Sequence, residues 1–427
     1  MTRSRPVIAV VYDKGAVAAG DIAVGLSDLA DIVFVVEPTE HVDRLRGVLD
    51  TLGAVLPLTG DRGADAAALR ARAPSALVTF SEPMLRTAAR LAADVGLPFH
   101  DVGTARLLTD KARQRRRLRE AEVDEVRSHP LHSPGDWPAA VAAVGLPAIV
   151  KPVRGEGSRD TYAVHDAARA PDLLAELFTA VRTSADEGAP FVAEELLPGR
   201  AGLPSGDYVS VESLCRPDGV THLALTGKFP LVRPFREPGQ YWPAQVSDAE
   251  RGEILDLTTR ALTALGVRTG LTHTEIKLTP AGPRIIEVNG RVGGHINELA
   301  RRACGVDLVR LAGLQALGEP IEARELRPAG VHFQHHGLAP VTPCRLVAVH
   351  GRREVRRLEG ISGYRLFARP GDQLPGGVMT HEMDILWGAC DDHDAMTAVI
   401  AKALATLSYE FEDADGIREV PAALLLA

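Results

Sequence analysis

The sequence predicts an N-terminal α/β domain with a parallel sheet, followed by a larger α+β region and a small mixed C-terminal region. Two observations predict this fold class. Over the first hundred residues, apolar β-branched runs alternate with helical patterns, as in a parallel sheet with crossover helices. From residue 191, strand patterns follow one another with little helix between them, which indicates an antiparallel sheet with helices on one side.

The N-terminal domain is expected over residues 1–105. Its predicted strands are Val7–Tyr12, Asp31–Glu37 and Ala76–Phe80, and a helical pattern over Glu82–Val95 ends at a glycine. No GxGxxG follows the first strand, so the sequence gives little support to dinucleotide binding.

A second unit is expected over residues 106–190. It opens with a helix capped by Thr109 or Asp110, and the basic run 113–119 of this helix is most simply a solvated face. A linker rich in Pro, His and Ser over 128–138 precedes a further helix and the strand Ala148–Pro152.

A third unit is expected over residues 191–330, and a C-terminal α+β region over 331–427. The last helix is predicted over Asp394–Leu407, and His332, His335 and His336 are better explained as part of a C-terminal strand than as a metal site. The elements predicted in the third unit are the strands Phe191–Leu197, Asp207–Arg216, Val220–Phe229, Leu271–Leu278 and Arg284–Gly290, and the helix Asp248–Leu265.

Composition and charge argue against several classes of protein. The chain is 45% apolar and 24% charged, which predicts a soluble globular protein, and no run approaches the ~18 apolar residues of a membrane helix. The apolar stretch near the N-terminus is too short for a signal peptide, and the four scattered cysteines suit a reducing cytoplasm. A net charge of −8 argues against a general nucleic-acid binder. We therefore expect a cytoplasmic protein with neither nucleic-acid nor membrane partners.

Lysine is rare in this chain. Only six of the 48 basic residues are lysine, and the others are arginine. Because arginine serves here wherever a generic cation suffices, the lysines are enriched at positions that need a compact ammonium group, such as phosphate contacts. Four of the six lie in or beside the motifs described below: Lys111, Lys151, Lys228 and Lys277.

The most informative stretch predicts a β-hairpin over residues 271–290, with a five-residue connection over 279–283. A hairpin symmetric about the middle of this connection places Glu275 opposite Glu287 on one face. Two opposed carboxylates repel each other, and a divalent cation is the simplest compensation. Asn289 adds a neutral oxygen, and such hard ligands favour Mg²⁺ or Mn²⁺ over zinc.

Two glycine-containing loops suggest binding of an anionic ligand. Gly293 and Gly294 follow Arg291 and precede a short helix, so the backbone can approach a ligand closely. The strand that ends with Lys151 runs into Gly155-Glu156-Gly157-Ser158, a loop that can fold its amide groups over a phosphate chain. This loop does not have the order of residues of a Walker A motif.

Taken in order, these motifs resemble the ATP-grasp superfamily, specifically its carboxylate–amine ligase branch, which includes the L-amino-acid (dipeptide) ligases. The resemblance spans about residues 100 to 320. The matching segments are Asp110-Lys111, Ile149 to Pro152, Gly155 to Ser158, Glu194 to Gly199, Tyr208 to Glu212, His273 to Lys277 and Glu287 to Arg291. The resemblance implies an ATP-grasp fold with two α+β subdomains, over 106–190 and 191–330, after the N-terminal domain.

The resemblance also implies roles for the matched residues. The phosphates of ATP would contact Lys111, Lys151, Lys228 and the loop of Gly155, Gly157 and Ser158. Adenine would lie at a hinge formed by Glu194, Glu195, Leu196 and Leu197, and the ribose near Asp207, although an apparent insertion over 200–206 departs from the family pattern there. Mg²⁺ (or Mn²⁺) would be held by Glu275, Glu287 and Asn289. The catalytic residues would be Arg291, His273 and Lys277, and the substrate would be bound by Arg291, Gly293, Gly294 and His295.

An enzyme of this branch activates a carboxylate with ATP, forms an acyl phosphate and releases ADP and phosphate as an amine displaces the phosphate. The expected substrates are a small carboxylate, such as an amino acid, and an amine, and such enzymes are usually homodimers. Two alternatives stay open. One is another ATP-grasp enzyme that forms an acyl phosphate, such as a carboxylase or a synthetase of nucleotide biosynthesis. The other is a non-catalytic ATP-binding protein.

Overall fold

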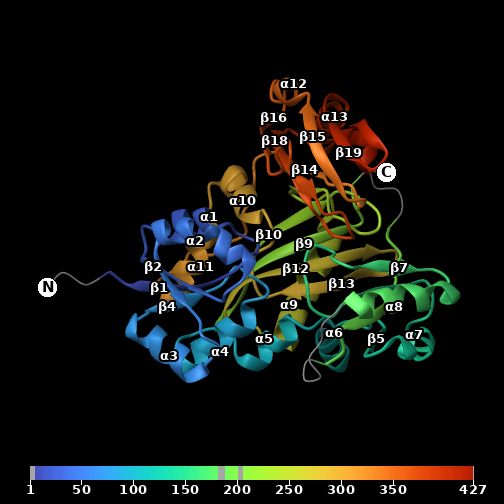
Figure 1. The fold of residues 1–427 in the computed structure, drawn as a ribbon. Helices are drawn as coiled ribbons and strands as arrows, with labels where there is room; N and C mark the ends of the chain where they lie inside the picture. Colours follow the sequence, from blue (N-terminus) through green and yellow to red (C-terminus); the bar gives the residue numbers. More distant parts are fainter. Residues whose placement is uncertain (1–4, 181–187, 201–204, 427) are drawn as a thin grey trace.

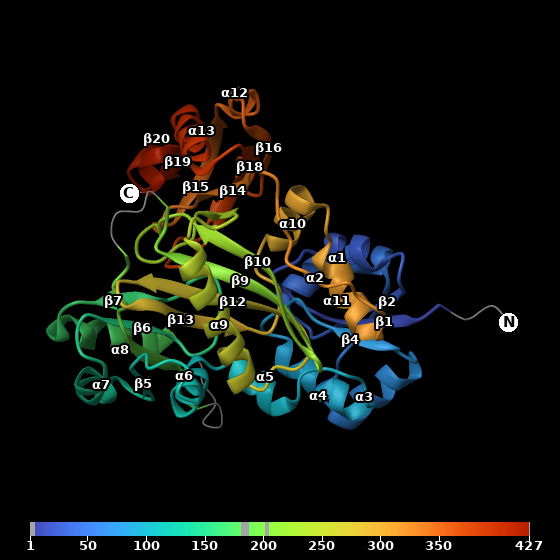
Figure 2. The ribbon, with the colours of Figure 1, turned by 180° about the vertical axis from the view of Figure 1, so that it is seen from behind.

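The computed structural model describes residues 5–180, 188–200 and 205–426. Four sheets carry the strands of these residues. The N-terminal sheet and a small sheet lie at opposite ends of a long central sheet, and a fourth sheet of C-terminal strands lies above it (Figure 1; Figure 2). The predicted fold class, a parallel α/β domain followed by antiparallel α+β units, is confirmed.

The N-terminal sheet is parallel, with the strand order β3-β2-β1-β4. The predicted strands and helix are present, and β3 is an additional short edge strand that its four residues did not reveal. The elements of this domain are β1 (Val7–Tyr12), α1 (Ala19–Leu26), β2 (Asp31–Val36), α2 (Glu40–Leu52), β3 (Ala54–Pro57), α3 (Arg62–Ala71), β4 (Ala76–Val78) and α4 (Leu85–Val95).

Apolar side chains on the two faces of this sheet belong to two separate cores. Alternate residues of β1 point to opposite faces, so Ile8 packs with α1 and α2, whereas Ala9 packs with α3 and α4. The first core also contains Leu308 and Val309 of α11 (Leu308–Leu317), which follows the central sheet in the chain. The N-terminal domain is therefore held to the central part of the molecule by a continuous apolar core.

The small sheet is antiparallel, with the order β5-β8-β6-β7. The strand at 191–195 pairs with β5 and β6, so it belongs to this sheet and not to the unit that was predicted to begin at residue 191. Residues 128–131, predicted as a linker, form its edge strand. The elements here are β5 (Ser128–Leu131), η1 (Pro134–Asp136), α7 (Trp137–Val144), β6 (Ala148–Pro152), β7 (Tyr162–Val164), η2 (Ala167–Arg169), α8 (Ala170–Ala180) and β8 (Phe191–Glu195).

The central sheet is antiparallel, with the order β13-β12-β9-β10-β11-β14-β18-β16. Its last three strands come from the predicted C-terminal region, so the boundary expected at residue 330 does not separate two sheets. The strands are β9 (Tyr208–Arg216), β10 (Gly219–Lys228), β11 (Gly239–Trp242), β12 (Gly270–Thr279), β13 (Gly282–Asn289), β14 (Val331–Leu338), β16 (Ile361–Leu366) and β18 (Glu382–Cys390). The helices near them are α5 (Val102–Leu108), α6 (Lys111–Glu120), α9 (Asp248–Ala264) and α10 (Ile296–Cys304).

The fourth sheet, with the order β17-β15-β19-β20, packs against the end of the central sheet. The predicted C-terminal helix is present as α13. The elements are β15 (Cys344–His350), α12 (Arg352–Val355), β17 (Gln373–Leu374), α13 (His393–Thr406), β19 (Ser408–Asp413), β20 (Gly416–Pro421) and η4 (Ala422–Leu426).

A buried aspartate connects these two sheets. The carboxylate of Asp384 on β18 accepts hydrogen bonds from the hydroxyls of Tyr364 (2.7 Å) and Tyr409 (2.8 Å) and from the backbone N–H of Gly337 (3.0 Å). Because Tyr409 lies on β19, this carboxylate joins the fourth sheet to the central one.

We predict that Asp384→Ala lowers the free energy of unfolding by about 3 kcal/mol, because three buried donors lose their acceptor. Urea unfolding of the purified chain measures the change. Asp391→Ala, an exposed aspartate just after the same strand, is the matched control and should stay within about 0.5 kcal/mol of the native chain. Equal stability of both variants would contradict the role of Asp384.

Candidate active site

Two carboxylates face each other on the hairpin of β12 and β13. Glu275 pairs with Glu287 in the strand register, as predicted, and His273 pairs with Asn289. The side chains of Glu275 and Glu287 are 21% and 16% exposed, so an ion from solvent can reach them. This arrangement places three oxygen-bearing side chains on one surface of the sheet.

The turn of this hairpin differs from the predicted one, although Glu275 and Glu287 pair as predicted. Its connection is a two-residue turn, since Thr279 already pairs with Gly282, whereas a five-residue loop over 279–283 was predicted. A bulge between Glu275 and Ile276 then shifts the register by one residue. The shift restores the pairing of the two carboxylates.

Lys111 compensates part of the negative charge of this pair. Its ammonium group lies 2.9 Å from Oε2 of Glu287 and donates to the carbonyl oxygen of Gly155, also at 2.9 Å. Burial alone would raise the pKa of Glu287, but Lys111 and the amide of Asn289 lower it well below its usual range. Lys111 thus connects the oxygen-bearing strands to the glycine loop.

Helix α6 places Lys111 and a second cation on the same side. Asp110 is the N-cap, and its side chain accepts a hydrogen bond from the N–H of Arg113. Arg115, one turn after Lys111, is buried, which corrects the interpretation of the whole basic run as a solvated face. Its position at i+4 from Lys111 was the signal that the sequence analysis did not use.

Arg115 and Lys151 enclose one carboxylate, that of Glu194. The guanidinium of Arg115 makes two hydrogen bonds of 2.9 Å to Glu194, and the ammonium of Lys151 lies 2.9 Å from it. All three side chains are buried. Burial alone would raise the pKa of Glu194, but the two cations lower it to about 2. Lys151 is therefore held in place at the end of β6.

The segment predicted as the adenine hinge follows Glu194 directly. The side chain of Glu195 accepts hydrogen bonds from the N–H and the guanidinium of Arg127 (2.9 and 2.8 Å). The N–H of Leu196 donates to the carbonyl oxygen of Pro147 at 3.1 Å, so this donor is already used within the chain. Leu197, the last hinge residue, is partly exposed.

The glycine loop between β6 and β7 folds toward the C-terminal segment. Gly155 and Gly157 have φ angles of 142° and 66°, which favour glycine, and Ser158 has a φ of 55°. The carbonyl oxygen of Gly157 accepts from the N–H of Thr380 at 2.8 Å. The loop therefore lies between the oxygen-bearing strands and the C-terminal strands.

His273 is buried between two carboxylates. One ring nitrogen is hydrogen-bonded to Glu212 of β9, and the other lies 3.3 Å from Glu275. Burial alone would lower the pKa of His273, but Glu212 and Glu275 raise it to about 9. Glu212 also accepts from the N–H of Gly293 at 3.1 Å, so it connects His273 to the loop that precedes α10.

Arg291 is buried and joins this loop to two other parts of the chain. Its Nε lies 3.4 Å from Glu82 of the N-terminal domain, and its Nη2 lies 3.7 Å from Glu156 of the glycine loop. Burial raises the pKa of Glu82 to about 7 despite the nearby charge of Arg291. Glu82 was not predicted as a site residue, because the sequence pattern places it in a helix of a separate domain.

The two remaining predicted lysines are engaged in other contacts. Lys277 donates to Asp207 at 2.6 Å, and residues 201–204 of the apparent insertion before this aspartate lie outside the described residues. Lys228 donates to Glu237 (2.7 Å) and Gln240 (2.8 Å). Because the amide of Gln240 also donates to the carbonyl oxygen of Gly294, Lys228 is connected to the loop before α10.

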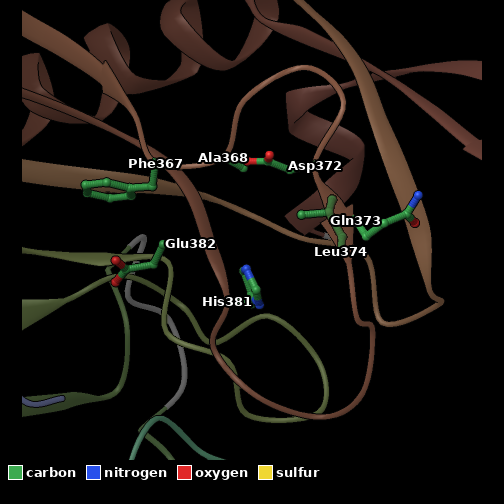
Figure 3. A pocket seen from close by; sticks show the side chains of 7 residues that line it. All are labelled: Phe367, Ala368, Asp372, Gln373, Leu374, His381 and Glu382. Carbon is green, nitrogen blue, oxygen red and sulfur yellow. The ribbon is translucent and has the colours of Figure 1, made fainter. Parts of the chain in front are cut away.

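His295 begins α10 and points toward the C-terminal strands. Its Nε2 lies 2.9 Å from Oε2 of Glu382, and its ring stacks on Phe367. Glu382 and Phe367 also line a cavity of about 290 Å³ (Figure 3). The cavity lies beside His295, and the carboxylate pair of β12 and β13 does not line it.

The structure thus brings together most of the predicted residues around one surface. Direct contacts connect the carboxylate pair to Lys111 and His273, and through Lys111 to the glycine loop. Lys277 and Lys228 have partners of their own beside this group. The arrangement concentrates ammonium and guanidinium groups beside oxygen ligands, which suits a polyphosphate carried with a divalent cation.

Comparison with known proteins identifies residues 144–298 as an ATP-grasp domain. The chain is 25% identical over 248 residues to alanine–anticapsin ligase of Bacillus subtilis (55% of this chain) and 29% identical over 374 residues to carnosine synthase 1 of Gallus gallus (83% of this chain). It spans only 52% and 35% of the lengths of these two relatives.

Among solved structures, the L-amino acid ligase of Bacillus licheniformis superimposes with a TM-score of 0.75 at 20% identity, over 96% of this chain and 99% of that one. In the part of the chain that the structure describes, every helix is too short or too polar to cross a membrane. Residues 144–298 thus match the ATP-grasp domain model, and the fold of the chain is that of the L-amino acid ligase structure.

Proposed function

We propose that this chain is an ATP-dependent carboxylate–amine ligase that joins an amino acid to a second amino acid or another amine through an acyl phosphate. The observation that carries the proposal is the pairing of Glu275 with Glu287 beside Asn289 and Lys111. Binding of ATP alone does not require a complete set of oxygen ligands next to a lysine ammonium group, whereas phosphoryl transfer does.

The phosphates of ATP would lie between Lys111, Lys151 and the glycine loop. Lys111 already contacts this loop at the carbonyl oxygen of Gly155. Lys151 is held by Glu194, so its ammonium group keeps a fixed position at the end of β6. These cations would neutralise charge that develops on the transferred phosphoryl group.

The three oxygen-bearing side chains fit a divalent cation of the magnesium type. Two carboxylates that pair directly across a hairpin repel each other unless a cation lies between or beside them, and all the donors are hard oxygens. Glu275, Glu287 and Asn289 would hold Mg²⁺ or Mn²⁺. When bound, the ion would neutralise phosphate charge and orient the γ-phosphate.

The reaction needs little beyond positioning and charge neutralisation. A carboxylate oxygen attacks the γ-phosphorus, the bond to the ADP oxygen breaks, and an acyl phosphate forms. The amine nitrogen then attacks the acyl carbon, the carbon–oxygen bond to phosphate breaks, and the amine loses a proton. Arg291 would hold the substrate carboxylate or acyl phosphate, since a buried guanidinium offers two parallel donors. His273 and Lys277 would complete the charged surroundings.

The relatives support this class of reaction. One of them is named as a ligase of alanine and anticapsin, and another as a synthase of carnosine. The acceptor side of the site would include His295, Gly293 and Gly294; of these, His295 contacts Glu382, which lines the cavity.

Release of ADP and phosphate with Mg²⁺ and ATP tests the proposal, first over single amino acids and then over pairs, with mass spectrometry of the products. We expect release that requires two amino acids and a new amide mass. Release that requires bicarbonate would favour a carboxylase instead. Binding of ATP without any release over the whole panel would favour the non-catalytic alternative.

We predict that Gly293→Ala lowers the rate of ADP release about 10- to 100-fold, because an added Cβ would lie 2.4 Å from the ring of His273 and displace it. Initial rates at saturating ATP measure the effect. Gly252→Ala on the exposed face of α9, where an added Cβ meets no atom within 4 Å, is the matched control. An unchanged rate in Gly293→Ala would mean that the position of His273 does not matter.

A further inference from the structure

A cluster of two histidines and a glutamate lies outside the carboxylate pair of the hairpin. It consists of His295 at the start of α10, His336 on β14 and Glu382 at the start of β18, and their ligand atoms all lie within 4.8 Å of one another. Nε2 of His295 lies 2.9 Å from Oε2 of Glu382, and Nδ1 of His336 lies 3.7 Å from Oε1. Three elements that are far apart in sequence therefore direct nitrogen and oxygen donors at one point.

An ion pair between His295 and Glu382 does not account for His336. This ring is buried, and its Nδ1 has no hydrogen-bond partner. A buried donor or acceptor atom without a partner is costly, and it indicates a ligand that the nitrogen can bind.

The backbone conformation of His295 and the side chains around it also support a ligand at this cluster. Its φ is 58°, a conformation that residues other than glycine adopt rarely, and it directs the ring at Glu382 rather than along the helix. Glu298, one turn later, lies 3.7 Å from the other ring nitrogen. A carboxylate on the far nitrogen of a histidine is the usual partner that orients a metal-binding imidazole.

We propose that His295, His336 and Glu382 form a second metal site, which takes a zinc-class divalent ion and is separate from the oxygen ligands of the hairpin. Two imidazoles and a carboxylate are the ligand set that zinc and its neighbours prefer, whereas magnesium prefers oxygen. Three protein ligands leave one coordination position for water or for a donor atom of a small molecule.

The cavity beside the cluster gives this open position a route to solutes. Glu382 belongs both to the cluster and to the lining of the cavity, where it lies close to Phe367 and His381 (Figure 3). An ion here would also connect the loop after Arg291 to two strands of the central sheet. Occupancy would therefore stabilise the position of His295 relative to β14 and β18.

Equilibrium dialysis of the chelator-treated chain against Zn²⁺, without ATP or Mg²⁺, tests the site, together with Co²⁺ titration followed by visible absorption. We expect one Zn²⁺ per chain, a low-symmetry Co²⁺ spectrum that Zn²⁺ abolishes, and a melting temperature that rises with Zn²⁺ concentration. An excess of Mg²⁺ should not displace the ion.

The variants Glu382→Gln and His336→Gln keep the size of the side chain and should lose the Co²⁺ spectrum and the stoichiometric Zn²⁺. Glu298→Gln should weaken binding by about 10- to 100-fold, as loss of an orienting partner does. His350→Gln is the matched control, because His350 forms an exposed pair with Glu410 at 2.9 Å, and it should bind as the native chain does.

Glu287→Gln should also keep the zinc site, which separates this proposal from the proposed function. Failure of the ligase assay would leave these results unchanged, and failure of zinc binding would leave the ligase assay unchanged. No bound Zn²⁺ in the native chain, or equal binding by the native chain and both His336→Gln and Glu382→Gln, would overturn the proposal.

Discussion

Glu287→Gln should reduce ATP-dependent release of ADP by about 10³-fold, because it removes one charged ligand of the proposed magnesium-type ion and the ion-pair partner of Lys111. Glutamine keeps the shape of the side chain and can still face Glu275 across the hairpin. The fold should therefore survive, since the substitution also removes the repulsion between two opposed carboxylates. Stopped or coupled assays of ADP release at several Mg²⁺ concentrations measure the loss.

Two controls make this result specific. Glu253→Gln makes the same chemical change on the exposed side of α9 and should leave the rate unchanged. Circular dichroism of both variants should match that of the native chain. If Glu287→Gln turned over ATP at the native rate, the assignment of Glu275, Glu287 and Asn289 to a cation would be wrong.

Glu194→Gln should be the most destabilising of the conservative substitutions considered, by about 3–5 kcal/mol at pH 7, because it leaves two buried cations without their anion. Arg115 and Lys151 both depend on this carboxylate, and all three side chains are buried. Urea unfolding followed by tryptophan fluorescence, to which Trp137 in the core of the small sheet contributes, measures the change.

The loss of stability caused by Glu194→Gln should depend on pH. The pKa of Glu194 in the folded chain is about 2, below its ordinary value of 4.5, so its contribution to stability is present above about pH 4.5 and is lost as the pH falls toward 2. The difference in stability between the native chain and Glu194→Gln should therefore narrow across this window. Glu120→Gln breaks an exposed pair with Arg116 and should change stability by less than 1 kcal/mol at every pH. A constant gap between pH 7 and pH 3 would mean that Glu194 is not held as a carboxylate.

Local sequence patterns were sufficient for much of the fold and for the central pair of the site. Alternation of side chains along the two strands and a nearly symmetric turn were sufficient to place Glu275 opposite Glu287. The turn itself was predicted wrongly, and a bulge made up the difference. The prediction succeeded because the register set by the two-residue turn differs by one residue from the predicted register, and the one-residue shift at the bulge cancels this difference.

Contacts and strand pairings between residues that are distant in sequence were not predicted. Arg115 was assigned to a solvated face; its i+4 spacing from Lys111 places both on one side of the helix, but the run of arginines does not reveal the carboxylate on a remote strand that Arg115 meets. Glu82 was not recognised, because its partner Arg291 follows it by some two hundred residues. The strand at 191–195 was placed in the wrong unit, because the order of strands in a sheet leaves no mark on the sequence of any one of them.

The sequence by itself determined most of the segments that form strands and helices, the residues proposed as oxygen ligands and phosphate-binding lysines, and the pairing of Glu275 with Glu287. These properties depend on periodicity and spacing over about twenty residues, which the chain carries locally. Only the tertiary structure decided that Lys151 is held by Glu194, that Arg291 meets Glu82, and that His295, His336 and Glu382 converge. Each of these contacts is a buried charged or polar group that needs a partner, and folding brings that partner from a remote element.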